Sequence, residues 1–243
     1  MFRNKSGLDG LTLLDGLLSI GSGAFQGCTG LDGTVTIPDS VTSLGAGAFN
    51  NCSGLDSVVI GDGITTIQTQ TFRVCTSLAS VTLGKNVTSI GTYAFNGAPL
   101  ANITMPASLA TIGDASFGAC ANLVGVYFEG DAPTATGDPW LVSRIPTVYY
   151  LAARTGWGAT FAGCTTVLWN PQIASDATFG AASGAFGFTI TGGSSGMLVV
   201  VEACTDLGTW SALETVSFTG STFAFSDAAY PGLDRRFYRF HMP

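Results

Sequence analysis

Charge is scarce in this chain, and positive charge is scarcer than negative charge. Only 10% of the 243 residues are charged, and 9 Lys plus Arg stand against 16 Asp plus Glu, which gives a formal net charge of -7. Such a protein is poorly suited to bind nucleic acid or an anionic membrane surface. Apolar runs are short as well, because none approaches the ~18 residues of a membrane-spanning helix. We therefore expect neither nucleic-acid binding nor membrane insertion.

Groups for catalysis or metal binding are also scarce. The single histidine, His241, lies beside the C-terminal end of the sequence, so a Ser-His-Asp or Cys-His arrangement would have to be assembled from a tail. The six cysteines form no CxxC pair and have no histidine near them, which argues against a zinc site. Many aspartates recur at fixed repeat positions and are interpreted as turn residues. The sequence predicts a noncatalytic protein without a metal or cofactor.

Phenylalanine, by contrast, recurs with a regular period. Its periodic members are Phe2, Phe25, Phe49, Phe72, Phe95 and Phe117. Their nearly even spacing, about one repeat per 23 residues, is typical of stacked units that are each too small to bury their own apolar face. We therefore predict a solenoid whose function resides on a surface that several turns build together.

Each repeat contains the apolar, polar, apolar triplet of a half-buried strand. The five triplets are residues 11–13, 35–37, 58–60, 81–83 and 103–105. A second apolar position follows seven residues later, at Ile20, Leu44, Ile67, Ile90 and Ile112. Three residues after Phe, four repeats carry a cysteine: Cys28, Cys52, Cys75 and Cys120. We interpret these cysteines as free, buried thiols rather than disulfides, because Cys is among the most buried residue types.

Together these positions form a family pattern. The motif Leu-x-x-Val-x-Ile-Pro-x-x-Val-Thr-x-Ile-Gly-x-x-Ala-Phe-x-x-Cys, present almost entire in residues 31–52, resembles the bacterial BspA-like leucine-rich repeat. The resemblance covers about residues 2–128, with departures at Gln68, Thr71 and Ala98. It implies a mainly β, right-handed leucine-rich-repeat solenoid with one parallel sheet. It also implies an extracellular or cell-surface protein that binds or adheres to other macromolecules.

The composition divides the chain into three regions. Residues 1–128 are expected to form about five full turns, beginning in mid-repeat because residues 2–8 overlay residues 49–55. The open end of such an array would expose a sheet edge, which favours self-association there. Residues 129–170 are expected to be an aromatic cap, since the repeat phase ends after Phe128. Residues 171–243 contain short apolar runs between Gly, Ser and Asp turns, which predict a small Ig- or fibronectin-like β-sandwich. This region resembles a C-terminal module common on secreted proteins of environmental bacteria.

The candidate ligand-binding residues lie on the predicted strands. Outward-facing triplet residues and the positions just before them are Thr12, Thr36, Ser57, Val59, Ser80, Thr82, Asn102 and Thr104. At ~4.8 Å per strand, five strands give a hydroxyl-rich strip of ~20–25 Å. The leading hypothesis is that this strip recognises a protein or a glycan. The plain alternative is that Thr is simply a favourable exposed strand residue.

Two other binding hypotheses remain open from the sequence. Aromatic residues of 123–170 could form a platform for sugar rings in a carbohydrate-binding accessory module, with its exposed members expected among Trp140, Tyr149 and Trp157. The same rings could equally cover the apolar end of the last coil. The Ser/Thr-x-Thr rungs could instead order water in the manner of ice-binding solenoids.

Overall fold

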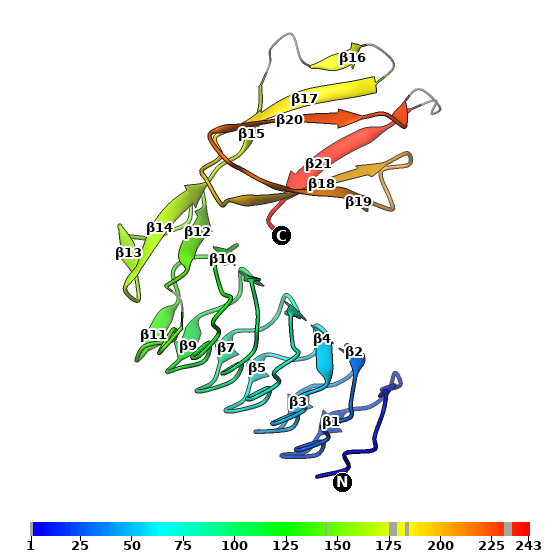
Figure 1. Cartoon of the computed structure of the whole chain (residues 1–243), viewed down its shortest axis with the longest axis vertical. Helices are drawn as coiled ribbons and strands as arrows, with labels where there is room; N and C mark the ends of the chain where they lie inside the picture. Colours follow the sequence, from blue (N-terminus) through cyan, green and yellow to red (C-terminus); the bar gives the residue numbers. More distant parts are fainter. Residues whose placement is uncertain (1, 144, 175–178, 183–184, 231–234) are drawn as a thin grey trace. The chain divides into compact units, whose positions relative to one another are not determined.

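A computed structural model describes residues 2–143, 145–174, 179–182, 185–230 and 235–243. Strands and turns make up these residues, and no α-helix is found among them. The chain forms two compact units, Met1–Val167 and Leu168–Pro243 (Figure 1). The first unit is a β-solenoid of about six turns, which confirms the predicted fold class.

One row of parallel strands runs along one side of the solenoid (Figure 1). Its members are β2 (Gly33–Ile37), β4 (Leu55–Ile60), β6 (Ser80–Thr82), β8 (Asn102–Met105), β10 (Gly125–Phe128) and β12 (Thr147–Leu151). Residues one repeat apart are paired in register, as in Val35 with Val58 and Val58 with Val81. The exposed and buried residues alternate on β2 and β4, as the triplet pattern predicts for strands with one buried face.

A second row of shorter parallel strands lies on the other side of the solenoid (Figure 1). It contains β1 (Ser19–Ile20), β3 (Ser43–Leu44), β5 (Thr66–Ile67), β7 (Ser89–Ile90), β9 (Thr111–Gly113) and β11 (Thr134–Thr136). The predicted second apolar positions point inward here, and Ile67 and Ile112 are fully buried. The two rows therefore enclose a continuous core that no single repeat could form alone.

The phenylalanines form a ring stack along the third side of each turn. Centroids of successive rings from Phe2 to Phe117 are 5.5, 5.1, 5.4, 5.4 and 5.3 Å apart, with nearly parallel planes. The backbone around each ring enters the left-handed region two residues before and two residues after it, as at Gly47 (φ 62°) and Asn51 (φ 60°) beside Phe49. These two reversals bend the chain into the tight arc that brings the next ring directly above the last.

The recurring cysteines satisfy backbone carbonyls of this arc. The Cys52 thiol donates to the Phe25 carbonyl at 3.1 Å, and the Cys75 thiol donates to the Phe49 carbonyl at 3.2 Å. Burial raises the pKa of the Cys52 thiol to about 12, so the neutral donor form is the one held in the core. The prediction of free, buried thiols is confirmed at all four repeat positions.

The expectation that the repeat phase ends at Phe128 is wrong by one turn. Trp140 occupies the phenylalanine position of a further turn, where its ring stacks on Phe117 with centroids 5.8 Å apart. Ser143 occupies the cysteine position, and its hydroxyl donates to the Phe117 carbonyl at 2.5 Å. Strands β11 and β12 complete this turn by pairing with β9 and β10. The larger indole ring and a hydroxyl in place of a thiol concealed the repeat.

A β-hairpin and an aromatic cluster follow this turn. The hairpin consists of β13 (Thr160–Phe161) and β14 (Cys164–Trp169), and β14 lies next to β12 in the sheet. Trp157 packs against Phe128 and Tyr150, and its indole N–H donates to the Gly130 carbonyl at 3.2 Å. Phe161 also contacts Phe128. These contacts cover apolar side chains that β10 and β12 would otherwise expose.

The second unit contains two antiparallel sheets. One has β15 (Gln172–Ile173), β16 (Gly180–Ala182), β17 (Ala185–Thr191) and β20 (Thr222–Asp227); the other has β18 (Leu198–Cys204), β19 (Ser211–Ser217) and β21 (Phe237–His241). Tyr238 of β21 packs against Phe186 and Phe188 of β17 and Phe225 of β20, which joins the sheets. This arrangement is consistent with the small sandwich expected from the strand pattern.

Candidate ligand-binding surfaces

The strand-face strip consists of eight side chains on the outward face of the first strand row. They are Thr34, Thr36, Ser57, Val59, Ser80, Thr82, Asn102 and Thr104, from β2, β4, β6 and β8. Thr36 and Thr82 are exposed, Val59 between them is 37% exposed, and Thr104 is half-buried. Parallel pairing aligns Thr36, Val59 and Thr82 across three strands. Thr12 is exposed but lies outside any strand, so it does not continue this row.

Thr34, Ser57, Ser80 and Asn102 form a second column of the strip, and some of these side chains hydrogen-bond to each other. The Thr34 and Ser57 hydroxyls are 2.5 Å apart, so they bond to each other. Ser80, in register with Ser57, is exposed, and Asn102 is half-buried with its side-chain oxygen lacking a partner within the described residues. The strip is therefore a polar surface on a rigid backbone ladder, with some hydroxyl groups already satisfied inside the protein.

Carboxylates border this strip. After β2, the Asp39 side chain accepts the Asp62 amide at 2.8 Å, and Asp62 in turn accepts the Lys85 amide at 3.0 Å. The Lys85 ammonium lies 2.5 Å from the Asp62 carboxylate, and this hydrogen bond lowers the pKa of Asp62. At the start of β2 and β4, the Asp56 carboxylate of β4 accepts the amide of Gly33, the first residue of β2, at 3.2 Å. These repeat-phased aspartates tie successive turns together and leave acidic edges along the strip.

A hydroxyl-bearing residue also stands at one outward position of the second strand row in each turn. The members are Ser19, Ser43, Thr66, Ser89, Thr111 and Thr134. The Thr111 hydroxyl donates to the Ser89 hydroxyl at 2.8 Å, and beside this row the Thr88 hydroxyl donates to the Thr65 carbonyl at 3.1 Å. These bonds give the hydroxyls a role in joining adjacent turns.

The aromatic-platform hypothesis needs exposed rings, and two of its three named residues do not provide them. Trp140 is only 4% exposed because it continues the phenylalanine stack, and Tyr149 is 3% exposed and stacks on Tyr127 with centroids 4.7 Å apart. Trp157 is half-buried against Phe128. The structure therefore corrects this part of the sequence reasoning: Trp140 and Tyr149 are packing residues. Their spacing in the sequence could have indicated this burial, since each residue follows its stacking partner by one repeat length.

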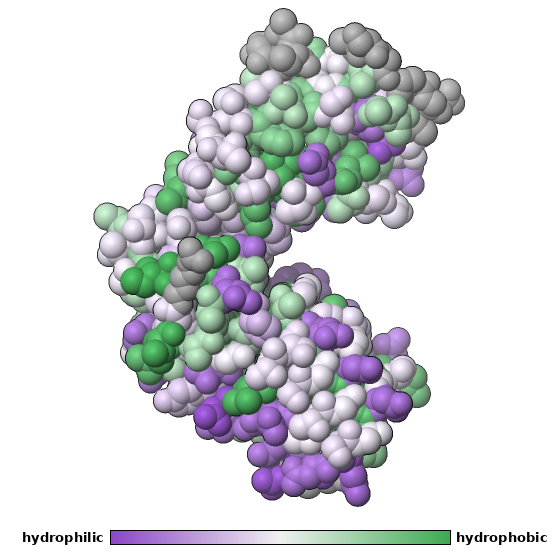
Figure 2. All heavy atoms as spheres, in the orientation of Figure 1, coloured by the Kyte–Doolittle hydropathy of each residue, from purple (hydrophilic) through white to green (hydrophobic). Residues whose placement is uncertain are grey.

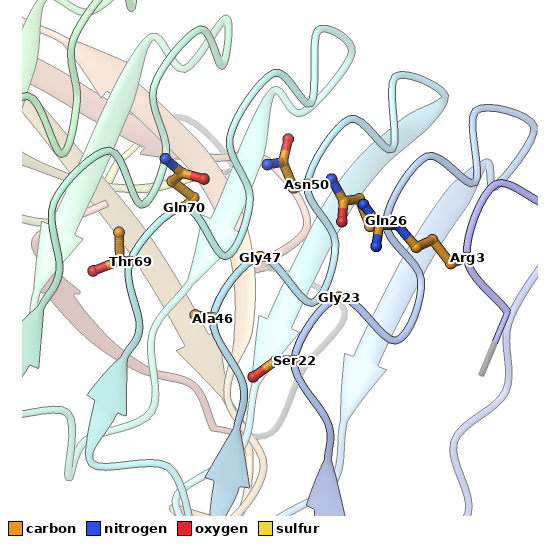
Figure 3. A pocket seen from close by; sticks show the side chains of 9 residues that line it. All are labelled: Arg3, Ser22, Gly23, Gln26, Ala46, Gly47, Asn50, Thr69 and Gln70. Carbon is orange, nitrogen blue, oxygen red and sulfur yellow. The ribbon is translucent and has the colours of Figure 1, made fainter.

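A surface that sequence reasoning missed lies on the phenylalanine arc. We call it the turn-face groove; it encloses about 350 Å³ and is lined by Arg3, Ser22, Gly23, Gln26, Ala46, Gly47, Asn50, Thr69 and Gln70. Figure 3 shows its side chains projecting from successive turns of the solenoid. The signal in the sequence was Gly two residues before Phe25 and Phe49, where the other turns carry larger residues.

In the ranges that the structure describes, no three His, Cys, Asp or Glu side chains come together as metal ligands would. The same residues include no helix that is long and apolar enough to cross a membrane. Figure 2 shows the visible face of the repeat unit as mostly neutral to hydrophilic, with hydrophobic side chains in small separate patches.

Two strand rows and an arc of stacked rings, repeated in every turn, define a leucine-rich-repeat solenoid. Residues 1–124 match the family described as BspA type leucine rich repeat region, with 6 copies, and the chain belongs to this family. None of the curated proteins matches the chain.

Solved structures that are similar to the chain include three bacterial leucine-rich repeat proteins. A leucine rich cell surface protein from Faecalibacterium prausnitzii A2-165 is 35% identical, with a TM-score of 0.50, over 54% of this chain and 35% of that one. A leucine-rich repeat protein from Bacteroides ovatus ATCC 8483 is 30% identical (TM-score 0.47) over 55% of this chain and 37% of that one. The T. pallidum leucine rich repeat protein is 25% identical (TM-score 0.46) over 59% and 73%. The chain thus spans little more than a third of the first two proteins.

Proposed function

We propose that the chain is a noncatalytic binding or adhesion protein of the cell surface or extracellular space, and that its strand-face strip recognises a protein partner. The observation that carries this proposal is the aligned, exposed row of Thr36, Val59 and Thr82 on hydrogen-bonded strands. A rigid row loses little conformational entropy on binding, which favours recognition by side chains already in place. The description of a 35% identical relative as a cell surface protein supports the location.

The charges around the strip favour one kind of partner. Asp39 and Asp62 border one edge, Asp56 borders the other, and Lys85 is paired with Asp62. An acidic glycan would be repelled by these carboxylates, whereas a basic protein surface would be attracted to them. Exposed charges act mainly on the rate of association and are screened by salt, so binding should weaken as ionic strength rises.

The other hypotheses have less support. Burial of Trp140 and Tyr149 removes two of the rings that a carbohydrate module would need. For ice binding, the column of outward threonines is interrupted by Val59, and the Thr34 hydroxyl is bonded to Ser57. No specific observation favours either function over protein recognition.

The experiment has two stages and uses the full chain. The labelled protein is first applied to arrays of extracellular-matrix proteins and of glycans, and its best protein ligand is then measured on a biosensor. We compare Val59→Arg and Thr82→Arg, which place a bulky positive charge in the strip, with Thr65→Arg at an exposed position beside β5. Loss of a central contact of about 2 kcal/mol corresponds to about 30-fold weaker binding for the first two variants.

The matched control decides the outcome. Thr65→Arg should bind like the unmodified chain, because it carries the same charge on the other strand row. Equal affinity of all three variants would place the binding surface elsewhere, and silent protein arrays would remove the proposed function.

A further inference from the structure

The turn-face groove exists because two turns have glycine where the others have a side chain. Gly23 and Gly47 adopt left-handed φ values of 60° and 62°, and their lack of a side chain leaves the floor open. At the equivalent positions, Gln70 and Tyr93 adopt nearly the same backbone conformation, with φ of 59° and 56°. In the turns that follow, the Arg73 guanidinium lies over the Tyr93 ring, 5.9 Å from its centroid. The ring and the cation therefore fill the space that stays open beside Gly23 and Gly47.

The polar side chains that line the groove are available to a ligand. Within the described ranges, no intramolecular hydrogen bond or ion pair engages the side chains of Arg3, Ser22, Gln26, Asn50, Thr69 and Gln70. The strand-face strip differs, because Thr34 and Ser57 bond to each other there. Each amide offers two donors and a carbonyl acceptor, and the guanidinium offers five donors.

Charge is also segregated between the faces of the first repeats. The carboxylates before residue 114 all lie outside the phenylalanine arcs, on either side of the repeat triplets, at Asp9, Asp15, Asp32, Asp39, Asp56 and Asp62. The phenylalanine arcs of the same repeats carry Arg3, Lys5 and Arg73, and their first carboxylate is Asp114. The groove therefore lies on a locally cationic face of an acidic protein, where an anionic group is attracted.

We infer that the turn-face groove binds an acidic saccharide, with Arg3 holding the sugar carboxylate and the amides of Gln26, Asn50 and Gln70 holding its hydroxyls. A guanidinium matches a carboxylate with two parallel hydrogen bonds. The volume of about 350 Å³ lies at the lower end of the ~300–1,000 Å³ range of small-molecule sites, which suits one or two sugar rings.

Other ligands fit these observations less well. Side chains on the same face of an extended peptide recur every ~6.6–6.8 Å, whereas the turns recur every ~4.8 Å, so a peptide along the groove would lose register after one contact. Nucleic acid would need a broad basic surface, and Arg3 is the single cation in the groove lining.

The test measures binding of defined oligosaccharides to the full chain by calorimetry. Two uronate ligands, an oligogalacturonate and a hyaluronan oligosaccharide, distinguish a plant-type from an animal-type source, and maltotetraose is the neutral reference. Gly47→Gln fills the groove with the residue type that the next turn already carries at φ 59°, so the solenoid should still fold at a cost of ~1–2 kcal/mol for the left-handed backbone. An ideal Cβ at Gly47 meets only the Asn50 Cβ, at 3.7 Å, which is an ordinary contact.

At least one uronate should bind and maltotetraose should not. Arg3→Gln should weaken uronate binding about 10-fold or more, as expected for loss of a charge-assisted hydrogen bond. Gly47→Gln should weaken it comparably while lowering the thermal unfolding midpoint by only a few degrees, as the ~1–2 kcal/mol cost of a left-handed φ implies for a chain of this size, and Thr82→Ala on the strand-face strip should have no effect. Absence of uronate binding, equal binding of the neutral sugar, or full binding by Gly47→Gln would each overturn the assignment. None of these outcomes bears on recognition through the strand-face strip.

Discussion

Replacement of Phe72 by alanine tests the ring stack at its centre. Phe72 is fully buried, and its ring lies between Phe49 and Phe95 with centroid distances of 5.4 Å on both sides. Phe→Ala in a core typically costs ~3–5 kcal/mol through lost transfer energy and the cavity that remains. Two ring pairs of ~0.5–1.5 kcal/mol each are lost together, so we expect the upper half of that range, about 4–5 kcal/mol.

Phe2→Ala is the matched control for this measurement. Phe2 is 52% exposed and stacks on Phe25 alone, so its truncation removes one ring pair and leaves no enclosed cavity. We expect a cost of ~1–2 kcal/mol. Urea unfolding followed by far-UV circular dichroism gives both values from the shift of the midpoint at constant slope. If Phe72→Ala costs no more than Phe2→Ala, the stack is not a principal source of solenoid stability and the reasoning is refuted.

Three further predictions concern other parts of the chain. Thr82→Ala, on an exposed strand position, should change the free energy of unfolding by well under ~1 kcal/mol in the same urea assay, and a larger loss would contradict its outward orientation. Because burial raises the pKa of Cys52 to about 12, folding favours its protonated form; stability should be constant below the ordinary thiol pKa of ~8.5 and fall as pH rises toward 12. A urea midpoint that rises between about pH 8.5 and 12 would contradict the inference that folding favours the protonated thiol. Asp227→Asn should destabilise the second unit by about 3 kcal/mol, because Arg236, 2.8 Å from the carboxylate, and the Tyr238 hydroxyl both lose their buried anion. Thermal unfolding measures this cost, and Glu214→Gln at an exposed position should leave the midpoint unchanged.

The core could be predicted from the sequence because one position is repeated in every turn. Phe49, Phe72 and Phe95 recur with the same neighbours, so the inward side of each turn follows from the period alone. The outward assignment of Thr36 and Thr82 follows from strand alternation in the same way. The prediction of the last turn failed because it relied on residue type. Trp140 stands at the phenylalanine position and Ser143 at the cysteine position, so the turn does not match the motif although the repeat spacing persists.

The turn-face groove could not be predicted from the strand pattern, since it depends on the space left by absent side chains. Gly23 and Gly47 are conformationally similar to Gln70, so the glycines are not dictated by the φ value alone. Non-glycine residues adopt the left-handed region at a cost of ~1–2 kcal/mol, which the stacked turns evidently tolerate at Gln70 and Tyr93. The first turns differ from the later ones in the space that Gly23 and Gly47 leave unfilled. This space becomes a groove only where successive phenylalanine arcs stack on one another.

The fold separates the positions that stabilise the solenoid from those that can bind. Each turn places its ring, its second apolar residue and, in four turns, a thiol in the core. The same backbone geometry is then available whatever side chains stand at Thr36, Val59 or Asn50. Substitutions on the strand-face strip and of the side chains that line the turn-face groove, apart from its left-handed glycines, should accordingly be nearly neutral for folding. Because adjacent rungs are only ~4.8 Å apart, substitutions of neighbouring rungs should couple in their effects on binding, whereas rungs three turns apart should act additively. The unit of recognition on such a surface is therefore a column of residues, and any single rung contributes only a share of the affinity.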